Sequence, residues 1–589
     1  MPQRRPLPGR ARVGLPVHRR EARRRGGAVR LGRLGALLLR QSRQLGDAGQ
    51  GARQLQRPDQ PVLGLRRRHH HPRVHPDGDR HRDQRGADLL QPAQDPGPDH
   101  HRHRRLRHLP LAAEHRPGGG GGWLAAAAAS GIIPALETPK EEPLRRFTLS
   151  LLLFGLVVAP ALAQNGERPK IFPYEAHVEV LDNGLTVILV PMSSGGLVAY
   201  WTIVRTGARD EWEPNRTGFA HFFEHMMFRG TERFPAEVYN AKITEIGADA
   251  NAFTSDDLTA YHLSITKDDL ATVMELESDR FKNLSYPEDL FRTEAGAVYG
   301  EYRKNRMNPF FALFEAVQAA AFTTHTYGHT AMGYEEDIKA MPGLYDYSRT
   351  FFERYYRPEN VVLLIVGDLE VGSTMELVRR HYGDWQKGYV PPQITPEPEQ
   401  TEERRIEVPY PGRSLPIVTL AYKVPAFDAK DRTYLALDLI ADLYFGTTSE
   451  LYKKLVLDEQ VVEFIFANRN VNRDPGLMNV TSRIKDPAKV DYVISEIDRT
   501  LAEAQNQPID AARLADVKSN FKYSFLMSLD TPSSVAGSLA RIVAVSGGIA
   551  AVEDMFATYD AITPEDVQRA ARTYLTPNRR TVAILRGAQ

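Results

Sequence analysis

Cysteine is absent from all 589 residues of this chain. Disulfide bonds, cysteine nucleophiles, cysteine zinc ligands and a lipid anchor on cysteine are therefore excluded. The formal net charge is also small, at +1, but this value hides an uneven distribution. Basic residues outnumber acidic ones by 30 to 13 in residues 1–163, whereas acidic residues outnumber basic ones by 61 to 45 in the remainder. The chain thus has a basic leading part and an acidic main part.

The leading part lacks aromatic residues. Residues 1–122 contain no Phe, Tyr or Trp, and 11 of the 18 histidines lie there among dense Arg, Pro and Gly. Such a composition cannot bury a core, so residues 1–143 are predicted to be disordered if they are translated. A nucleic-acid-binding tail would normally mix Lys with Arg, yet the first lysine is Lys140. We therefore favour a mistaken start codon, with the true start near Leu144, and expect no nucleic-acid partner.

Residues 144–163 have the order of a secretory signal. Arg145 and Arg146 precede an apolar run from 147 to 158, and Ala161-Leu162-Ala163 supplies small residues for cleavage. The apolar run is too short to span a bilayer comfortably, so no transmembrane anchor is expected in the mature chain. Cleavage after Ala163 would leave 426 residues, and the bacterial periplasm is the predicted location.

The most informative motif is His221-Phe222-Phe223-Glu224-His225. On an α-helix, residues four apart lie on one face, so the two imidazoles can share a metal. Glu224 lies at the flank of that face, where it can act on water without binding the metal. A catalytic zinc site needs a third protein ligand and an open position, and H-x-x-E-H is the inverzincin motif.

A second predicted helix carries the missing carboxylate. Ser285 reads as its N-cap, and the run 290–306 contains Glu294 and Glu301 seven residues apart, which is two turns on one face. An H-x-x-E-H motif followed by such a glutamate pair, with Glu301 76 residues after His225, resembles the pitrilysin and mitochondrial processing peptidase family. Further matching segments are 247–261, 327–329 and 360–368.

The resemblance implies roles for individual residues. The metal ligands would be His221, His225 and Glu301, holding one zinc per chain. Within the catalytic centre, Glu224 would be the general base and Glu294 a supporting carboxylate that balances charge. The resemblance also assigns substrate binding to an edge strand with Asn251, Ala252, Phe253 and Thr254.

The mature length suits two domains of similar size. A polar, Pro-rich stretch at 389–404 is predicted as a linker between a zinc-bearing peptidase domain at 164–388 and a domain at 405–589. Strands such as 185–190 and 417–422 alternate with long amphipathic helices, which predicts an α+β fold with helices packed on mainly antiparallel sheets.

The two predicted domains resemble copies of one unit. Aligning residues 221–228 with residues 438–445 keeps the apolar positions but places Asp438, Ala441 and Asp442 at the positions of the two histidines and the base. The second domain is therefore predicted to be inactive. The family has the same arrangement of paired homologous domains in which only the first binds zinc.

Active members of that family enclose substrate between two such two-domain halves, and this chain resembles a single half. The partnering half typically supplies an Arg and, seven residues later, a Tyr near the zinc. This chain has Val456 and Glu463 at those places. We therefore expect a homologous zinc-free partner chain that supplies both, and consider a homodimer less favoured. The alternative is that Arg469 or a neighbour replaces the missing donor.

These features predict an exported zinc endopeptidase that hydrolyses peptides or unfolded polypeptides, as the catalytic subunit of a heterodimer. A non-catalytic assembly or scaffold subunit related to processing peptidases is the alternative. A scaffold has no physical need to retain both ligands and base, so the intact motif favours the enzyme.

Overall fold

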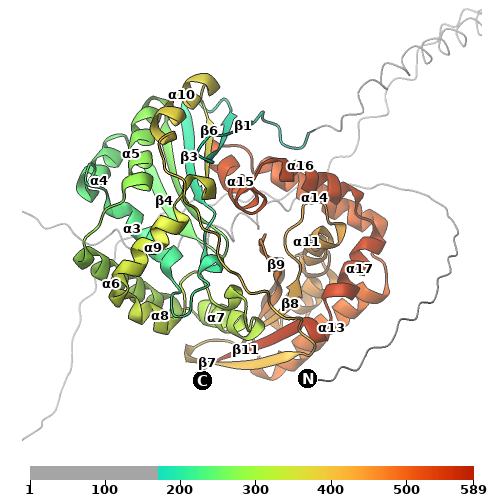
Figure 1. Ribbon diagram of the computed structural model, residues 1–589. Coiled ribbons are helices and arrows are strands. Elements are labelled where there is room, and N and C mark those ends of the chain that lie inside the picture. The colour runs from blue at the N-terminus through green and yellow to red at the C-terminus, as the bar shows by residue number, and fades with distance from the viewer. Residues whose placement is uncertain (1–169, 589) are drawn as a thin grey trace, which may run out of the picture. The chain divides into compact units, whose positions relative to one another are not determined.

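The computed structural model describes residues 170–588 (Figure 1). The predicted leader at 1–143 and the signal at 144–163 lie outside this range. The described residues form two halves, each built around one sheet. The first half spans residues 177–382 and the second spans residues 404–588. The predicted α+β class is confirmed.

Two mixed sheets form the centres of the halves. The strands of the first half are β1 (His177–Val180), β2 (Thr186–Pro191), β3 (Leu197–Val204), β4 (Asp249–Thr254), β5 (Thr259–Thr266) and β6 (Val361–Gly367). The strands of the second half are β7 (Arg404–Arg413), β8 (Ile417–Val424), β9 (Val462–Arg469), β10 (Gly476–Ile484) and β11 (Arg580–Ala588).

Helices of matching order connect the strands. Those of the first half are α3 (Phe219–Met226), α4 (Ala236–Glu245), α5 (Leu270–Asn283), α6 (Glu288–Arg306), α7 (Pro309–Ala321), α8 (Glu335–Ala340), α9 (Tyr345–Tyr355) and α10 (Val371–Tyr382). Those of the second half are α11 (Arg432–Phe445), α12 (Glu450–Tyr452), α13 (Val490–Asn506), α14 (Ala511–Met527), α15 (Pro532–Ser546), α16 (Ala550–Ala561) and α17 (Pro564–Tyr574).

The two sheets share one topology. The order in the first is β1-β2-β6-β3-β5-β4, and in the second it is β7-β11-β8-β10-β9. Apart from the extra β1, each strand of the first sheet has a counterpart at the same place in the second. In each sheet one pair is parallel, β2 with β6 and β7 with β11, and the other pairs are antiparallel. The prediction that the second half copies the first is supported at the level of topology.

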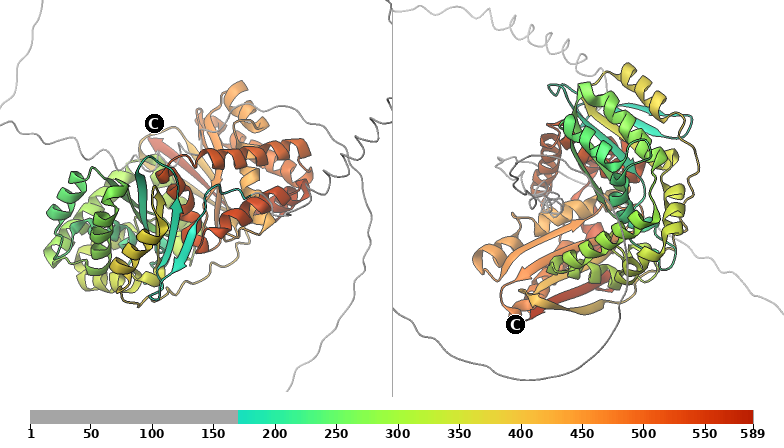
Figure 2. Two further views of the ribbon diagram at one scale, coloured as in Figure 1. Left: turned by 90° about the horizontal axis from the view of Figure 1, so that it is seen from above. Right: turned by 90° about the vertical axis from the view of Figure 1, so that its left-hand side faces the viewer.

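Both faces of the first sheet are covered, which explains its continuous apolar strands. In β2, Val187 and Leu189 point into a core shared with α3, α5 and α6, whereas Ile188 and Val190 point into a core shared with the second half. That second core includes α15, which packs on β3 and β6 (Figure 1, Figure 2). Strands buried on both faces lose the polar alternation of a half-exposed sheet.

A helix of the first half covers the second sheet in return. Leu313 and Val317 of α7 pack on Ile417, Ala421 and strand β11 (Figure 1). Both α7 and α15 are the third helix after the fourth shared strand of their half, β5 or β10. In each half this helix packs on the sheet of the other half. The halves therefore share cores and are not separate globules joined by a linker.

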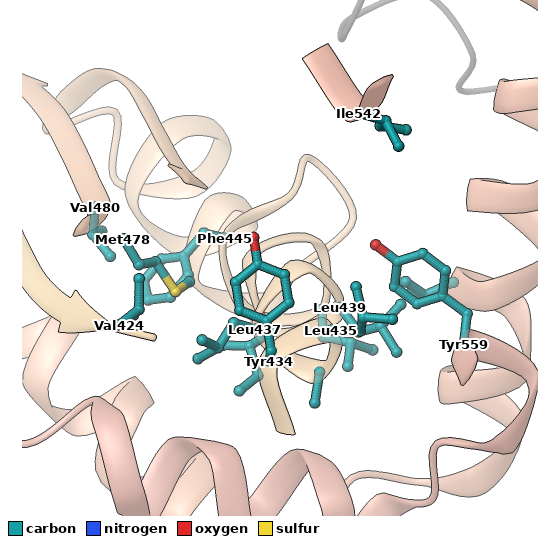
Figure 3. Packing of buried hydrophobic residues seen from close by; sticks show 14 of the residues in the cluster. Val424, Tyr434, Leu435, Leu437, Leu439, Phe445, Met478, Val480, Ile542 and Tyr559 are labelled. Atoms are coloured by element: carbon teal, nitrogen blue, oxygen red, sulfur yellow. The ribbon is translucent and has the colours of Figure 1, made fainter. Parts of the chain in front are cut away.

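Helices cover the remaining face of the second sheet. Tyr434 and Leu437 of α11 and Tyr559 of α16 lie among the buried apolar side chains of this core (Figure 3). The stretch 389–403, predicted as most of the linker, forms neither helix nor strand. Within residues 170–588, no single helix has the length and apolarity to cross a membrane, although the bent pair α15 and α16 together meets those two criteria.

Candidate active site

The helix that carries the H-x-x-E-H motif, α3, is capped by two residues outside the motif, Gly218 and Glu211. Gly218 precedes α3 with φ +91°, and a Cβ there would lie 2.8 Å from the Met332 carbonyl oxygen, so glycine is required. The buried carboxylate of Glu211 accepts the backbone N–H groups of Gly218 (2.8 Å) and Ala220 (2.7 Å). These bonds satisfy donors at the helix N-terminus and fix the direction of α3.

Aromatic packing then sets the rotation of α3. Phe222 contacts Phe291 of α6 with ring centroids 5.0 Å apart, and Phe223 stacks on Phe351 of α9 at 5.5 Å. Both phenylalanines of the motif are fully buried. Because these two residues point into the core, His221, Glu224 and His225 are left on the flank that faces α6 and β4.

Helix α6 supplies the two glutamates, as the sequence predicts. It begins at Glu288 behind Pro287, so the expected Ser285 cap is wrong. Pro287 is the N-cap itself, and with φ −76° and ψ 162° its backbone is still extended just before the first helical turn. Glu294 and Glu301 both face α3, where Glu294 is nearly fully buried and 37% of the Glu301 side chain is exposed.

Three side chains converge on one point. Potential ligand atoms of His221, His225 and Glu301 all lie within 4.8 Å of one another. The Nε2 atom of His225 is 3.2 Å and that of His221 is 3.8 Å from Glu301 Oε2. Exposure rises from His221 (8%) through His225 (25%) to Glu301 (37%), so the group opens to solvent on the α6 side.

The surroundings of this group favour a cation. Burial alone would lower the pKa of His225, but hydrogen bonds with Glu294 and Glu301 outweigh it and raise the pKa to about 9. The bond from His225 is the main cause that lowers the pKa of Glu301 to about 2. Burial lowers the pKa of His221, which keeps that imidazole neutral and able to bind a metal. Two carboxylates thus stabilise positive charge beside two imidazoles.

The donor set fits zinc. Two imidazole nitrogens and one carboxylate oxygen are the usual three protein ligands of a catalytic zinc site. His225 Nδ1–H donates to Glu294 Oε1 at 3.4 Å, which leaves Nε2 free to face the shared point. Outer carboxylates commonly orient a ligating histidine in this way. Glu294 in turn accepts a bond from Arg229 Nε at 2.6 Å. Arg229 was not predicted, because it lies outside the motif.

The fourth residue of the motif faces the predicted substrate strand. The Thr254 hydroxyl donates to Glu224 Oε2 at 2.7 Å. Thr254 ends β4, which is the last strand in the order of the first sheet, so its prediction as an edge strand is confirmed. Along β4, Ala252 packs toward α3 with Thr254, whereas Phe253 points to the opposite face beside Trp201. Asn251 Oδ1 accepts the Ala252 N–H.

The three second-half positions considered as donors in the sequence, Val456, Glu463 and Arg469, all make contacts within the second half. Val456 packs against the core of the second half, and Glu463 on β9 pairs with Arg483 at 3.3 Å. Arg469 is 3% exposed, pairs with Asp438 at 2.5 Å and lies over the Tyr434 ring. Its guanidinium thus contacts Asp438 and Tyr434 within the second half.

Comparison with protein families identifies the class. Residues 187–335 match the model described as insulinase (peptidase family M16), and residues 345–521 match the model described as the peptidase M16 inactive domain. The chain therefore belongs to peptidase family M16, a family of zinc peptidases.

Individual relatives agree with this assignment. The zinc protease PqqE of Helicobacter pylori is 28% identical over 450 residues, which cover 75% of this chain and all of that protein. The mitochondrial-processing peptidase subunit beta of Mus musculus is 26% identical and covers 75% of this chain and 91% of its own length.

Solved structures share the fold. A protease from Helicobacter pylori superposes with a TM-score of 0.66 at 27% identity, covering 70% of this chain and 99% of that one. The periplasmic protease PqqL of Escherichia coli gives a TM-score of 0.60 at 18% identity, and the match covers 70% of this chain but 48% of that one. At this identity the second match shows the fold alone.

Proposed function

We propose that the chain is an active zinc-dependent endopeptidase that cuts peptides or unfolded polypeptides. The observation that carries this proposal is the convergence of His221, His225 and Glu301 within 4.8 Å, with Glu224 beside them and bonded to the edge strand. Each of these residues has a separate chemical task. A protein that had lost catalysis would need neither the ligands nor the base.

The residues of the site define a mechanism. When bound, zinc supplies a Lewis acid that makes water more acidic and polarises a peptide carbonyl. Glu224 takes the proton from the attacking water and later passes it to the leaving amine. The Thr254 hydroxyl donates a hydrogen bond to Glu224 Oε2, so Oε1 is the oxygen that receives the proton. Glu294 keeps the ring of His225 in place.

Peptide substrate would bind by adding a strand to β4. The free edge of β4 offers backbone N–H and C=O groups, and pairing of this kind reads the main chain of a peptide. An extended peptide on this edge would run past Thr254 and Glu224. Broad specificity for unfolded chains follows, because a folded protein cannot present such a strand.

We further propose that a homologous zinc-free chain completes the enzyme. Val456 packs into the core, Glu463 pairs with Arg483, and Arg469 pairs with Asp438, so none of the three supplies a donor to a peptide carbonyl. Loss of such donors commonly costs about 10²–10³ in rate. The partner would supply the Arg and Tyr. Export to the periplasm is proposed from residues 144–163 and is tested by fractionating cells that express the full gene.

The test is peptide cleavage by residues 164–589, alone and with a zinc-free homologue that carries the Arg and Tyr. We expect about one zinc per chain, weak cleavage alone, and about 10²-fold faster cleavage with the partner. A partner whose Arg is replaced by Ala is the matched control and should not restore activity. Efficient cleavage by the chain alone, as monomer or homodimer on sizing, would refute the heterodimer.

The alternative is a non-catalytic scaffold subunit of the same family. It predicts that zinc-loaded protein cleaves no peptide with any homologous partner and that Glu224→Gln leaves its biological role intact. A complementation assay with the Glu224→Gln gene therefore separates the two functions.

A further inference from the structure

The turn between β9 and β10, residues 470–475, reaches from the second half to the end of β4. Asn472 Nδ2 donates to Asp257 Oδ2 at 3.0 Å. Arg473 Nη2 donates to the carbonyl oxygens of Asp257 (3.0 Å) and Arg205 (2.5 Å). Asp257 is fully buried and follows Thr254 by three residues. The second half thus bonds directly to the turn that ends the edge strand.

The same turn is tied to further segments of the first half. The Asp257 carboxylate accepts the Tyr327 hydroxyl at 2.8 and 3.0 Å. Asp474 pairs with Arg209 Nε at 2.6 Å and with His325 Nε2 at 3.1 Å. Tyr327 belongs to a segment that resembles the family, and this contact gives it a physical role. A buried charge in such a network is stable only while its donors are in place.

A backbone link carries this network to the site. Ala208 N–H and Arg209 N–H donate to the carbonyl oxygens of Ser255 (3.2 Å) and Asp256 (2.8 Å). Gly207 lies so close that a Cβ would be 2.2 Å from the Ser255 oxygen. Ser255 directly follows Thr254, whose hydroxyl bonds to Glu224. The position of this turn therefore decides where Thr254 lies.

We propose that Asn472 and Arg473 are positioning residues of the active site. They hold the β4–β5 turn so that Thr254 stays against Glu224 and β4 stays ordered for an incoming peptide. The need is physical, because an edge strand is bonded on one side only and its end opens easily. This inference rests on the proposed peptidase function. It gives the inactive half a part in catalysis.

Joining the two halves does not by itself explain these contacts. Ser264 of β5 bonds to Ser533 of α15 at 2.8 Å, and Glu553 of α16 accepts the N–H groups of Ile171 and Phe172 in the segment that precedes β1. The shared cores join the halves as well. Ser533→Ala is therefore a matched control, since it removes a bond between the halves that does not involve the β4–β5 turn.

The experiment compares Asn472→Ala, Arg473→Ala and Ser533→Ala in the full chain with its partner. Zinc content, melting temperature, hydrogen exchange of residues 249–254 and separate kcat and KM values are measured. We expect zinc to stay bound, exchange in β4 to rise about tenfold, kcat to fall about tenfold and KM to rise in the first two variants. Arg473→Lys, which keeps the positive charge and N–H donors on a single nitrogen but loses the planar guanidinium, should recover part of kcat. Ser533→Ala should match wild type.

Equal exchange in β4 for Asn472→Ala and Ser533→Ala, with unchanged kcat, would overturn the inference. If Arg473→Ala fails to fold, Asn472→Ala carries the test, because it removes a smaller neutral group. Absence of cleavage by every form, wild type included, counts against the proposed function instead. Hydrogen exchange then still decides whether the turn orders β4.

Discussion

The two halves carry different side chains on equivalent helices, α3 and α6 in the first half and α11 and α14 in the second. In the first half, α3 and α6 bring His221, His225 and Glu301 together at the surface of a buried core. At the equivalent place on α11, Asp438 replaces the first histidine. Its Oδ2 accepts Arg469 Nη2 at 2.5 Å and the Tyr559 hydroxyl at 2.6 Å. An ion pair within the protein thus stands where the first half has its group of potential metal ligands.

The second histidine and the glutamate pair are replaced in the same way. Asp442 stands at the place of His225, and burial raises its pKa, opposed by Arg513 and Asn520. Arg513 and Asn520 are seven residues apart on α14, as Glu294 and Glu301 are on α6. A cationic and a neutral side chain on α14 thus lie beside Asp442, whereas two carboxylates on α6 lie beside His225. In residues 170–588 the one group of three or more metal-capable side chains is the first-half site.

The shared scaffold therefore does not itself require a metal. Apart from β1 and α10, which only the first half has, the strand order and the helix packed on the other half's sheet are the same in both halves, yet the charges beside α3 and α11 differ. A buried site of this kind must be neutralised, and either a metal with its ligands or an internal ion pair can do so. The capacity to bind a metal differs between the halves because of a few side chains on α3, α6 and α11, on a shared fold.

Removing the two histidines is expected to have the largest effect. His221→Ala with His225→Ala leaves one carboxylate ligand, which holds zinc too weakly, so zinc should fall from about one per chain to none and cleavage should cease. Metal analysis after dialysis measures this. The matched change in the second half, Asp438→Asn with Asp442→Asn, should keep zinc. Zinc retained by the histidine variant would contradict the ligand assignment.

The base is expected to matter next. Glu224→Gln should keep zinc and fold but lower kcat about 10²–10⁴-fold, because an amide cannot accept the proton from water. Ala441→Ser, at the equivalent place on α11, should leave kcat unchanged. Steady-state kinetics on one peptide with both variants measures the difference. Wild-type turnover by Glu224→Gln would place the base elsewhere.

Breaking the ion pair of the second half should affect stability and not zinc. Arg469→Met leaves the Asp438 carboxylate with one donor, Tyr559, and should lower the free energy of unfolding by about 3 kcal/mol. Asp438→Leu combined with Arg469→Met should recover most of this loss, since no charge is then left unpaired. Urea denaturation of the three proteins measures it. An additive double variant would show that the pair is not coupled.

A smaller effect is expected on the free energy of unfolding, which should fall in acid because of His329 in the first half. Burial lowers the pKa of His329 from 6.5 to about 4, and the ring donates from Nδ1 to the Thr330 carbonyl. The unfolded chain therefore binds a proton that the folded chain does not, and stability falls as pH drops from 6.5 toward 4. From pH 7.5 to pH 5 the loss should be about 2 kcal/mol.

His329→Gln should remove that part of the pH dependence. Zinc-free protein is used for both chains, so that loss of the metal does not contribute. Denaturant unfolding at pH 7.5 and pH 5 gives the two differences. The same acid loss in His329→Gln and wild type would show that other groups are responsible.

Local patterns were sufficient for the elements that hold the site. The spacing of four between His221 and His225 and of seven between Glu294 and Glu301 predicts shared helix faces, and both helices are observed. The edge strand with Asn251 to Thr254 was expected from the family resemblance of segment 247–261, and these residues lie in β4 at the edge of the first sheet. Periodicity succeeds here because the ligands on each helix are neighbours in sequence.

Other contacts could not be predicted in this way. Glu211 caps α3 from outside the motif, Thr254 meets Glu224 across 30 residues, and Arg473 meets Asp257 across 216. Ser285 was expected as a cap, but the chain before Glu288 is extended and Pro287 takes the place. Such pairs depend on the packing of whole elements, which no local pattern records.

Residue types and their spacing along the chain are enough to indicate which side chains could bind a metal, which could act as a base, and which half lacks both. Covalent spacing along a helix is enough to place such groups on one face. Only in the folded chain do α3 and α6 bring His225 and Glu301 within 3.2 Å. The packing of α7 and α15 on the sheet of the other half, and the contact of Arg473 with the β4–β5 turn, also depend on the folded chain. These outcomes arise from burial of apolar faces far apart in the chain, a property of the folded whole.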